Sequence, residues 1–140
     1  MLEAAARETA EVAAKFKIAK PSVIAVTVLT SLDDAALVEM GVDRTAAGQV
    51  AVLGALAHEA GCDGVVCSPD EAAAMRALFG TDGLVVTPGV RPTWAEAEDQ
   101  ARVATPAEAL AAGASHLVIG RPITAAADPA AAVRRIVEGE

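Results

Sequence analysis

SVIAVTV, residues 22–28, is a short run of mostly β-branched side chains with almost no polar interruption. A strand that is buried on both faces has this composition, and such strands belong to parallel sheets covered by helices. The stretch therefore predicts an α/β fold that contains a buried parallel strand.

Three further strands are predicted along the chain: DGVVC at residues 63–67, GLVVT at 83–87 and HLVIG at 116–120. Helical patterns follow the strands, over 33–39 and 45–60, over 68–79, over 105–113 and over 128–137, the last after a short turn at Arg121-Pro122. A helix over residues 1–16 precedes the first strand. The sequence predicts one domain, residues 1–140, with four βα units from about residue 22 to 138.

Two of the helix starts carry the same local signal. Ser68-Pro69-Asp70-Glu71 and Thr105-Pro106-Ala107-Glu108 each place a proline directly after a hydroxyl residue and a glutamate three residues after it. This order is typical of a capped helix N-terminus, so we expect Ser68 and Thr105 to cap their helices. The acidic pair Asp33-Asp34 is expected to cap the helix over 33–39.

Parallel strands with helices between them form either open, doubly wound sheets or closed eight-stranded barrels. No GxGxxG motif follows any of the four strands, so a dinucleotide-binding fold has no motif support. Four βα units are half of a barrel, and a whole barrel takes at least ~200 residues. The 140 residues are therefore too few for a whole barrel.

Charge and composition exclude several functions. With 11 Lys and Arg against 19 Asp and Glu, the net charge of −8 argues against nucleic-acid binding, which needs basic stripes. No apolar stretch approaches the roughly 18 residues of a membrane span, and no signal peptide is visible, so we expect a cytoplasmic protein that binds no membrane. Cys62 and Cys67 lack the further ligands of a zinc site, and we expect both to be reduced, with no metal bound.

Small residues, hydroxyls and arginines gather where the predicted strands end. The clusters are LTS at 29–31, CSP at 67–69, TPGVR at 87–91 and GRP at 120–122. The carboxyl ends of parallel strands form the ligand-binding edge of α/β folds. Glycine allows close approach of the backbone and arginine presents two donors to a phosphate, so the clusters predict a phosphate site at that edge.

Taken singly, the same residues have structural interpretations. Arg121 could pair with Asp128, and Thr30 could bond to nearby backbone. The glycines could serve only as turn residues. We expect His58 and His116 to be structural rather than catalytic.

The order of the motifs adds more than any single residue. AVTVLTS at 25–31, DGVVCS at 63–68, VTPGVRP at 86–92, DQARVATPAEA at 99–109 and VIGRPIT at 118–124 together resemble the C-terminal half of bacterial orotidine 5'-phosphate decarboxylases. The resemblance covers nearly the whole chain, and the combination of motifs is highly specific. Ala101 departs from the pattern, because family members commonly carry a basic residue there.

The resemblance implies the C-terminal half of a TIM (β/α)8 barrel of the phosphate-binding type. The family is usually homodimeric and converts orotidine 5'-monophosphate (OMP) to UMP and CO2 in pyrimidine biosynthesis, without metal or organic cofactor. Carried over by motif, the substrate-binding residues are Thr30 at the pyrimidine ring, Pro88 in the base pocket, Arg91 and Arg121 on the phosphate, Gly120 as a backbone phosphate donor, and Gln100 on a loop that closes over phosphate and base.

The catalytic part of the family pattern is missing. Decarboxylation in the family uses lysines and aspartates around an Asp-x-Lys-x-x-Asp motif, and this sequence lacks that motif. Its lysines, Lys15, Lys17 and Lys20, lie in the first helix and its exit. We therefore assign no catalytic residue and expect the chain to be inactive alone.

Three functions stay open at this point. The chain is half of an OMP decarboxylase, active once the first half is supplied, or a non-catalytic half-barrel that binds nucleotide phosphates, or part of a related sugar-phosphate decarboxylase. A half-barrel also exposes two sheet edges and an apolar lining. We therefore expect self-association, a complementary N-terminal half as partner, or a partly molten state.

Overall fold

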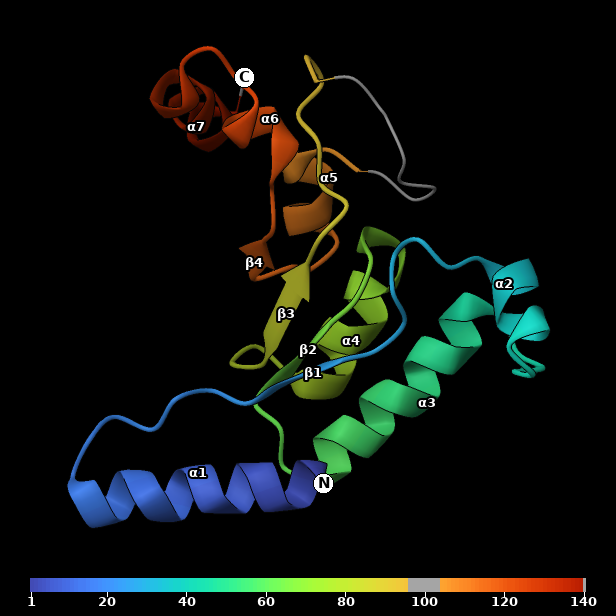
Figure 1. Ribbon diagram of the computed structural model, residues 1–140, viewed down its shortest axis with the longest axis vertical. Helices are drawn as coiled ribbons and strands as arrows, with labels where there is room; N and C mark the ends of the chain where they lie inside the picture. The colour runs from blue at the N-terminus through green and yellow to red at the C-terminus, as the bar shows by residue number, and fades with distance from the viewer. Residues whose placement is uncertain (96–103, 140) are drawn as a thin grey trace.

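The computed structural model describes residues 1–95 and 104–139 and contains one parallel sheet with the strand order β1-β2-β3-β4 (Figure 1). The strands are β1 Ile24–Val26, β2 Gly64–Val66, β3 Leu84–Thr87 and β4 His116–Leu117. The predicted number, order and direction of strands are confirmed. Each strand is shorter than the stretch predicted for it; β1 keeps three of seven residues and β4 keeps two of five.

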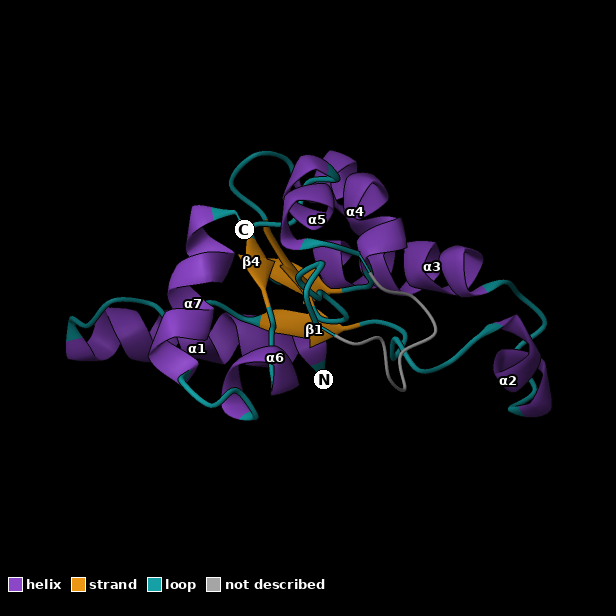
Figure 2. Ribbon diagram, turned by 90° about the horizontal axis from the view of Figure 1, so that it is seen from above, coloured by secondary structure: helices purple, strands orange, loops and turns teal. Residues whose placement is uncertain are grey.

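The helices also follow the predicted order. They are α1 Leu2–Phe16, α2 Asp34–Glu39, α3 Ala46–Glu59, α4 Ala72–Phe79, α5 Pro106–Ala111, α6 Arg121–Thr124 and α7 Pro129–Glu138, with a 3-10 turn η1 at Pro69–Glu71 before α4. Figure 2 shows α3, α4 and α5 on the same side of the sheet, where α3 packs on β2, α4 on β3 and α5 on β4. In the described part of the chain, no helix combines the length and the apolar character that crossing a bilayer requires.

The helix caps are confirmed in part. Thr105 and Glu108 form a complete capping box, with the Glu108 N–H donating to Thr105 Oγ1 (3.2 Å) and the Thr105 N–H donating to Glu108 Oε2 (2.8 Å). Asp33 accepts from the Ala36 N–H, as expected. Asp34 instead accepts from the Ala46 N–H (2.7 Å), which ties the two neighbouring helices together.

The expected cap by Ser68 is wrong. Its side chain accepts no hydrogen bond from the helix backbone. The Ser68 hydroxyl donates instead to the Glu71 carboxylate, and both side chains are buried. The reason is local: a 3-10 turn rather than an α-helical turn follows Ser68, and a buried carboxylate needs a donor.

One face of the sheet forms the core. Ala25, Val65 and Val85 are paired across β1, β2 and β3, so their side chains point to the same face. They are 7%, 0% and 0% exposed, and the cluster they belong to includes Val50 of α3 and Met75 of α4. The helical layer therefore covers this face.

The opposite face is open on β1, contrary to the expectation of burial on both faces. Ile24 is 41% exposed and Val26 is 59% exposed. In a strand, residues alternate between faces, so these two side chains point away from Ala25 and from the helices. The residues of this chain that the structure describes provide no second layer for them, although the sequence of β1 is apolar on both sides.

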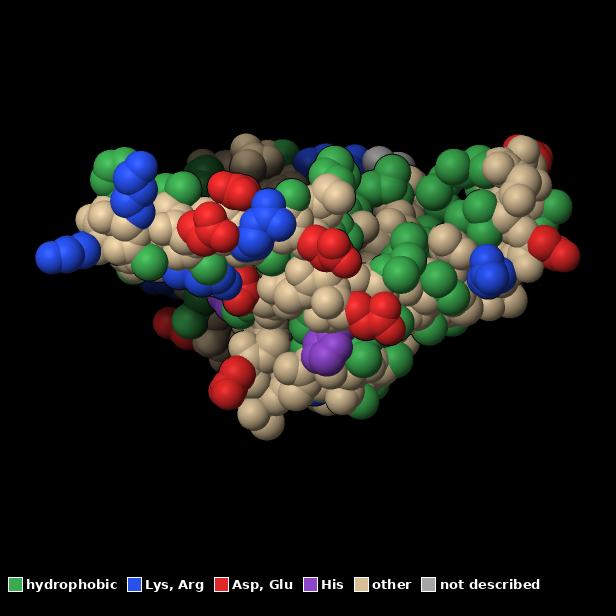
Figure 3. Space-filling model, turned by 90° about the horizontal axis from the view of Figure 1, so that it is seen from below, with side chains coloured by type: hydrophobic (Ala, Val, Ile, Leu, Met, Phe, Trp, Pro, Cys, Tyr) green, Lys and Arg blue, Asp and Glu red, His purple; other side chains and the backbone are tan. Residues whose placement is uncertain are grey.

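Helix α1 lies across the amino ends of the strands (Figure 1). Viewed from below, this side of the molecule carries charges of both signs with apolar side chains exposed between them (Figure 3). Val12 and Phe16 of α1 are 45% and 64% exposed.

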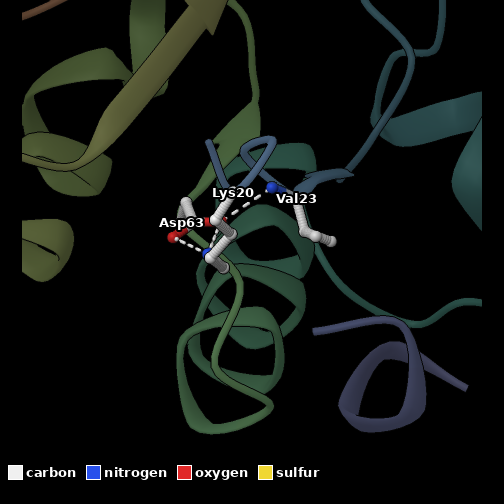
Figure 4. Close-up of polar contacts among 3 residues, drawn as sticks. All are labelled: Lys20, Val23 and Asp63. Carbon is white, nitrogen blue, oxygen red and sulfur yellow. Dashed lines mark hydrogen bonds and ion pairs between the residues drawn. The ribbon is translucent and has the colours of Figure 1, made fainter. Parts of the chain in front are cut away.

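An ion pair joins the exit of α1 to the start of β2 (Figure 4). Lys20 Nζ lies 2.7 Å from both carboxylate oxygens of Asp63, and the Val23 N–H donates to Asp63 Oδ2 at 2.7 Å. Burial raises the pKa of Asp63, but the hydrogen bonds from Lys20 and Val23 and the Lys20 charge outweigh it and lower the pKa below its ordinary value. The carboxylate is thus stabilised in its charged form.

Asp63→Asn should lower the free energy of unfolding by about 1 kcal/mol at neutral pH, because it removes a charged acceptor for both donors. Since the folded pKa of Asp63 is depressed, its contribution is complete above the unfolded pKa of about 3.9 and is lost as the pH falls through the folded pKa. Urea unfolding at several pH values should therefore show that the difference in free energy of unfolding between wild type and variant becomes smaller in acid. The exposed Asp43→Asn is the control, and an equal, pH-independent gap for both variants would contradict the prediction.

Candidate functional site

A hollow of about 240 Å³ lies at the carboxyl ends of the first strands. Its lining comes from three segments that are far apart in the sequence: Val26 at the end of β1 with Val28, Leu29, Thr30 and Ser31 after it, Val66 of β2, and Pro88 after β3. The hollow thus brings together two of the sequence-predicted residues, Thr30 and Pro88. Ser31 lines it too, although the sequence analysis singled out only Thr30 from that cluster.

Strand register explains this convergence. Val26 pairs with Val66, and Val66 pairs with Val86, so the segments that follow these residues emerge at the same edge. The Thr27 hydroxyl donates to the Val66 carbonyl (2.7 Å), which holds the end of β1 against β2. Thr30 and Pro88 are then carried to one hollow by strands whose order the sequence predicted.

The hollow suits a small ring with polar edges. Its wall is formed by valine and leucine side chains and a proline, and the hydroxyls of Thr30 and Ser31 supply hydrogen-bonding groups. Val26 and Val66 belong to the face of the sheet that the helices leave open, so the hollow continues onto that face.

Arg91 follows β3 and is only 7% exposed. Its backbone N–H donates to the Ala104 carbonyl (2.9 Å), and Val90 and Ala104 form a parallel bridge. Gly89, with φ of 78°, adopts the left-handed conformation that turns the chain into this bridge. The bridge holds the backbone of Arg91 in place where β3 ends.

Gly120 and Arg121 begin α6 and are exposed. Thr87 pairs with Leu117, and Arg91 and Arg121 each lie four residues beyond that pair. The two arginines therefore leave neighbouring strands at the same edge of the sheet. The lining of the hollow includes neither arginine nor Gly120. The sixth predicted residue, Gln100, lies outside the described residues.

The lysines lie at the other end of the sheet. Lys20 binds Asp63 before β1, Lys17 ends α1, and the Lys15 ammonium lies 5.5 Å from the centre of the Phe16 ring. The sequence contains no other lysine. An ammonium group of this chain is therefore not available at the hollow beside Thr30 and Pro88.

Other polar clusters have structural explanations. The exposed His58 makes an edge contact with Phe79, and His116 Nδ1 lies 3.0 Å from Ser115 Oγ. A larger hollow of about 470 Å³ is lined by carboxylates of Asp33, Asp34, Asp70 and Glu71, a charge that repels phosphate. Within residues 1–95 and 104–139 there is no group of three or more metal-ligating side chains.

Both cysteines are buried, and no disulfide joins them. Burial, together with the nearby Asp63 charge, raises the pKa of the Cys62 thiol. A raised pKa keeps the thiol protonated and unreactive.

A parallel sheet with helices on one face and loops gathered at its carboxyl edge defines this chain as a partial (β/α)8 barrel, as predicted. Residues 1–136 match the family described as "Orotidine 5'-phosphate decarboxylase / HUMPS family". The chain belongs to this family.

Individual relatives agree with this assignment. The chain is 56% identical over 136 residues to the orotidine 5'-phosphate decarboxylase of Paramagnetospirillum magneticum, covering 97% of this chain and 58% of that protein. The corresponding values for the Moorella thermoacetica enzyme are 57% over 137 residues, 97% and 54%. The chain thus spans about half the length of the curated relatives it matches.

Solved structures show the same fold. The crystal structure of orotidine 5'-phosphate decarboxylase from Lactobacillus acidophilus superimposes with a TM-score of 0.70 at 40% identity, over 87% of this chain and 50% of that one. A second such enzyme, from Pyrococcus horikoshii, superimposes with a TM-score of 0.60 at 19% identity, over 86% of this chain and 51% of that one.

Gly89→Ala should lower stability by about 1 kcal/mol, because a Cβ atom disfavours the positive φ of this residue. Gly41→Ala is the matched control, since Gly41 has a φ of 81° and open space around the position of a Cβ. Only Gly89→Ala should also loosen the bridge between Val90 and Ala104, measured as faster hydrogen exchange of the Arg91 amide. Equal exchange rates at Arg91 in the two variants would refute this role for Gly89.

Proposed function

We propose that residues 1–140 act as one partial-barrel domain that binds the phosphate and pyrimidine of OMP and UMP in an orotidine 5'-phosphate decarboxylase. The supporting observation is the hollow that joins Thr30 to Pro88 at the edge where Arg91 and Arg121 also leave the sheet. We propose a cytoplasmic location, which the buried, unbridged cysteines support.

The proposed roles are those that the family resemblance implies. The Arg91 and Arg121 guanidinium groups bind the phosphate by charge-assisted hydrogen bonds, with the Gly120 N–H as a further donor. The pyrimidine enters the hollow, where the Thr30 hydroxyl meets its polar edge and Pro88 packs against it. Gln100 is proposed to close over phosphate and base. Phosphate contacts far from the reacting carbon supply binding energy that helps to stabilise the transition state.

The bond-breaking step needs groups from outside this chain. In the proposed reaction the bond between C6 of the pyrimidine and the carboxylate breaks, CO2 leaves, and an ammonium group gives a proton to the electron pair left on C6. The lysines of this chain lie at the amino ends of the strands, and Lys20 is bound to Asp63. We therefore propose that a complementary N-terminal half supplies the lysine and aspartates. No metal or organic cofactor is proposed.

The proposed N-terminal half completes the barrel. It adds parallel strands beside the open edges of the sheet and covers Ile24 and Val26, which the helices of this chain leave exposed.

A second candidate function is nucleotide-phosphate binding without chemistry. The position of the lysines favours it for the chain by itself, because binding needs only the arginines and the hollow. Self-association would then replace the complementary chain as the cover of the open face.

Reconstitution tests the proposal. This chain alone should form no UMP from OMP, whereas its mixture with the first half of the Paramagnetospirillum magneticum enzyme should do so. Ile24→Lys should abolish this activity, because it places a charge on the open face that the partner covers, outside the lining of the hollow. Val38→Lys should retain it, since Val38 is also exposed (60%) but belongs to α2 and not to the sheet.

Turnover by this chain alone would disprove the need for an outside lysine. Equal loss of activity in Ile24→Lys and Val38→Lys would disprove the proposal that the partner covers the open face of the sheet. If the mixture binds UMP without turnover, the binding-only function is favoured.

Arg121→Ala should weaken UMP binding by tenfold or more, because a charge-assisted hydrogen bond contributes about 1.5–3 kcal/mol. Isothermal titration calorimetry on the reconstituted mixture measures the effect. Arg134→Ala, which removes an exposed arginine of α7, is the control and should leave the affinity unchanged. An unchanged affinity in Arg121→Ala removes this residue from the proposed site.

A further inference from the structure

The C-terminal helix α7 contacts both segments that carry the proposed phosphate-binding arginines. It packs against α6, whose first residue is Arg121, and the two helices lie side by side in Figure 1. On another side, the guanidinium of Arg135 lies 4.6 Å from the centre of the Trp94 ring. Trp94 ends a short segment, residues 91–94, that begins with Arg91; we name this segment the stem.

The stem meets α7 at more than the arginine–tryptophan contact. A small hollow of about 120 Å³ is lined by Pro92 and Thr93 of the stem, by Thr105, Pro106 and Ala107 at the start of α5, and by Ile136 and Gly139 at the end of α7. Pro92 is among the fully buried side chains. The last turn of α7 therefore packs beside the stem, next to the capped start of α5.

Helix α7 is itself well defined at both ends. The Asp128 carboxylate accepts from the Ala131 N–H (3.0 Å), and Pro129 occupies the first helical position. Gly139 ends the helix in the left-handed conformation, with its N–H donating to carbonyls of the last turn. Ala132 is 5% exposed. A helix with these ends can act as a rigid link between the elements it touches.

We propose that α7 is a brace that sets the distance between Arg91 and Arg121, and that Arg135 is a positioning residue acting through Trp94. Two guanidinium groups share one phosphate only if their spacing is held, and small displacements of binding groups cost large factors in affinity. Arg135 holds the stem by a cation–π contact. The α6 contact holds the other arginine to the same helix. Arg135 itself touches no ligand.

The brace can be measured without any ligand. Arg135→Ala should speed hydrogen exchange of the Arg91 amide and shift the emission of Trp94, the only tryptophan of the chain, to longer wavelength as its ring becomes exposed to water. Arg135→Lys keeps a cation over the ring and should restore both signals in part. Arg134→Ala, the neighbouring exposed arginine, should change neither.

The consequence for binding rests on the proposed function. In the reconstituted mixture, Arg135→Ala should weaken UMP binding roughly three- to fivefold, raise KM by a similar factor and leave kcat nearly unchanged. Arg135→Lys should recover part of the loss.

The outcomes separate the two proposals. Equal hydrogen exchange of the Arg91 amide in Arg135→Ala and Arg134→Ala overturns the proposed brace, whatever the affinity of the variants for UMP. If Arg135→Ala speeds exchange at Arg91 but keeps the wild-type affinity for UMP, then Arg135 holds the stem without setting the spacing of the two arginines. That outcome also overturns the proposal. If neither the wild type nor the variants bind UMP, the proposed function fails. The exchange and fluorescence results then still decide whether Arg135 holds the stem.

Discussion

The in-register pairing of Val26, Val66 and Val86 is the constraint on which the rest of the structure depends. Because the strands are parallel and aligned, every segment that follows a strand emerges at one edge, and every segment that precedes a strand lies at the other. The same register places Ala25, Val65 and Val85 against the helices. One arrangement of backbone hydrogen bonds thus produces both the core and the hollow that holds Thr30 and Pro88.

The two edges of the sheet have different roles. At the amino ends, the Lys20–Asp63 ion pair joins α1 to the sheet and contributes to stability. At the carboxyl ends, the bridge between Val90 and Ala104 and the turn at Gly89 fix the backbone of Arg91, and Thr30 and Ser31 line the hollow. This separation is general in parallel α/β folds, because helix N-termini and loops with free donors gather at only one edge. It also explains why the lysines of the chain are remote from the proposed binding site.

Local sequence signals predicted most of the fold. The four strands, the order of the helices and the caps by Thr105 and Asp33 depend on a few neighbouring residues, and the structure confirms them. The errors arose where distant residues decide. Ser68 bonds to a buried glutamate instead of the helix backbone. The outer side of β1 is exposed, because its apolar sequence is suited to a layer that the described residues do not supply. The motifs identified the family, and the comparisons agree with them.

The sequence by itself determined the class of fold, the positions of its elements and the residues worth testing, because hydrophobic period, capping and turn chemistry act over a few residues. Only the tertiary structure decided which of those residues meet. Thr30 and Pro88 share a hollow, Asp63 holds Lys20, and Arg135 covers Trp94. Each of these contacts joins segments that are distant in the chain, so it depends on strand register and helix packing, which no local pattern specifies.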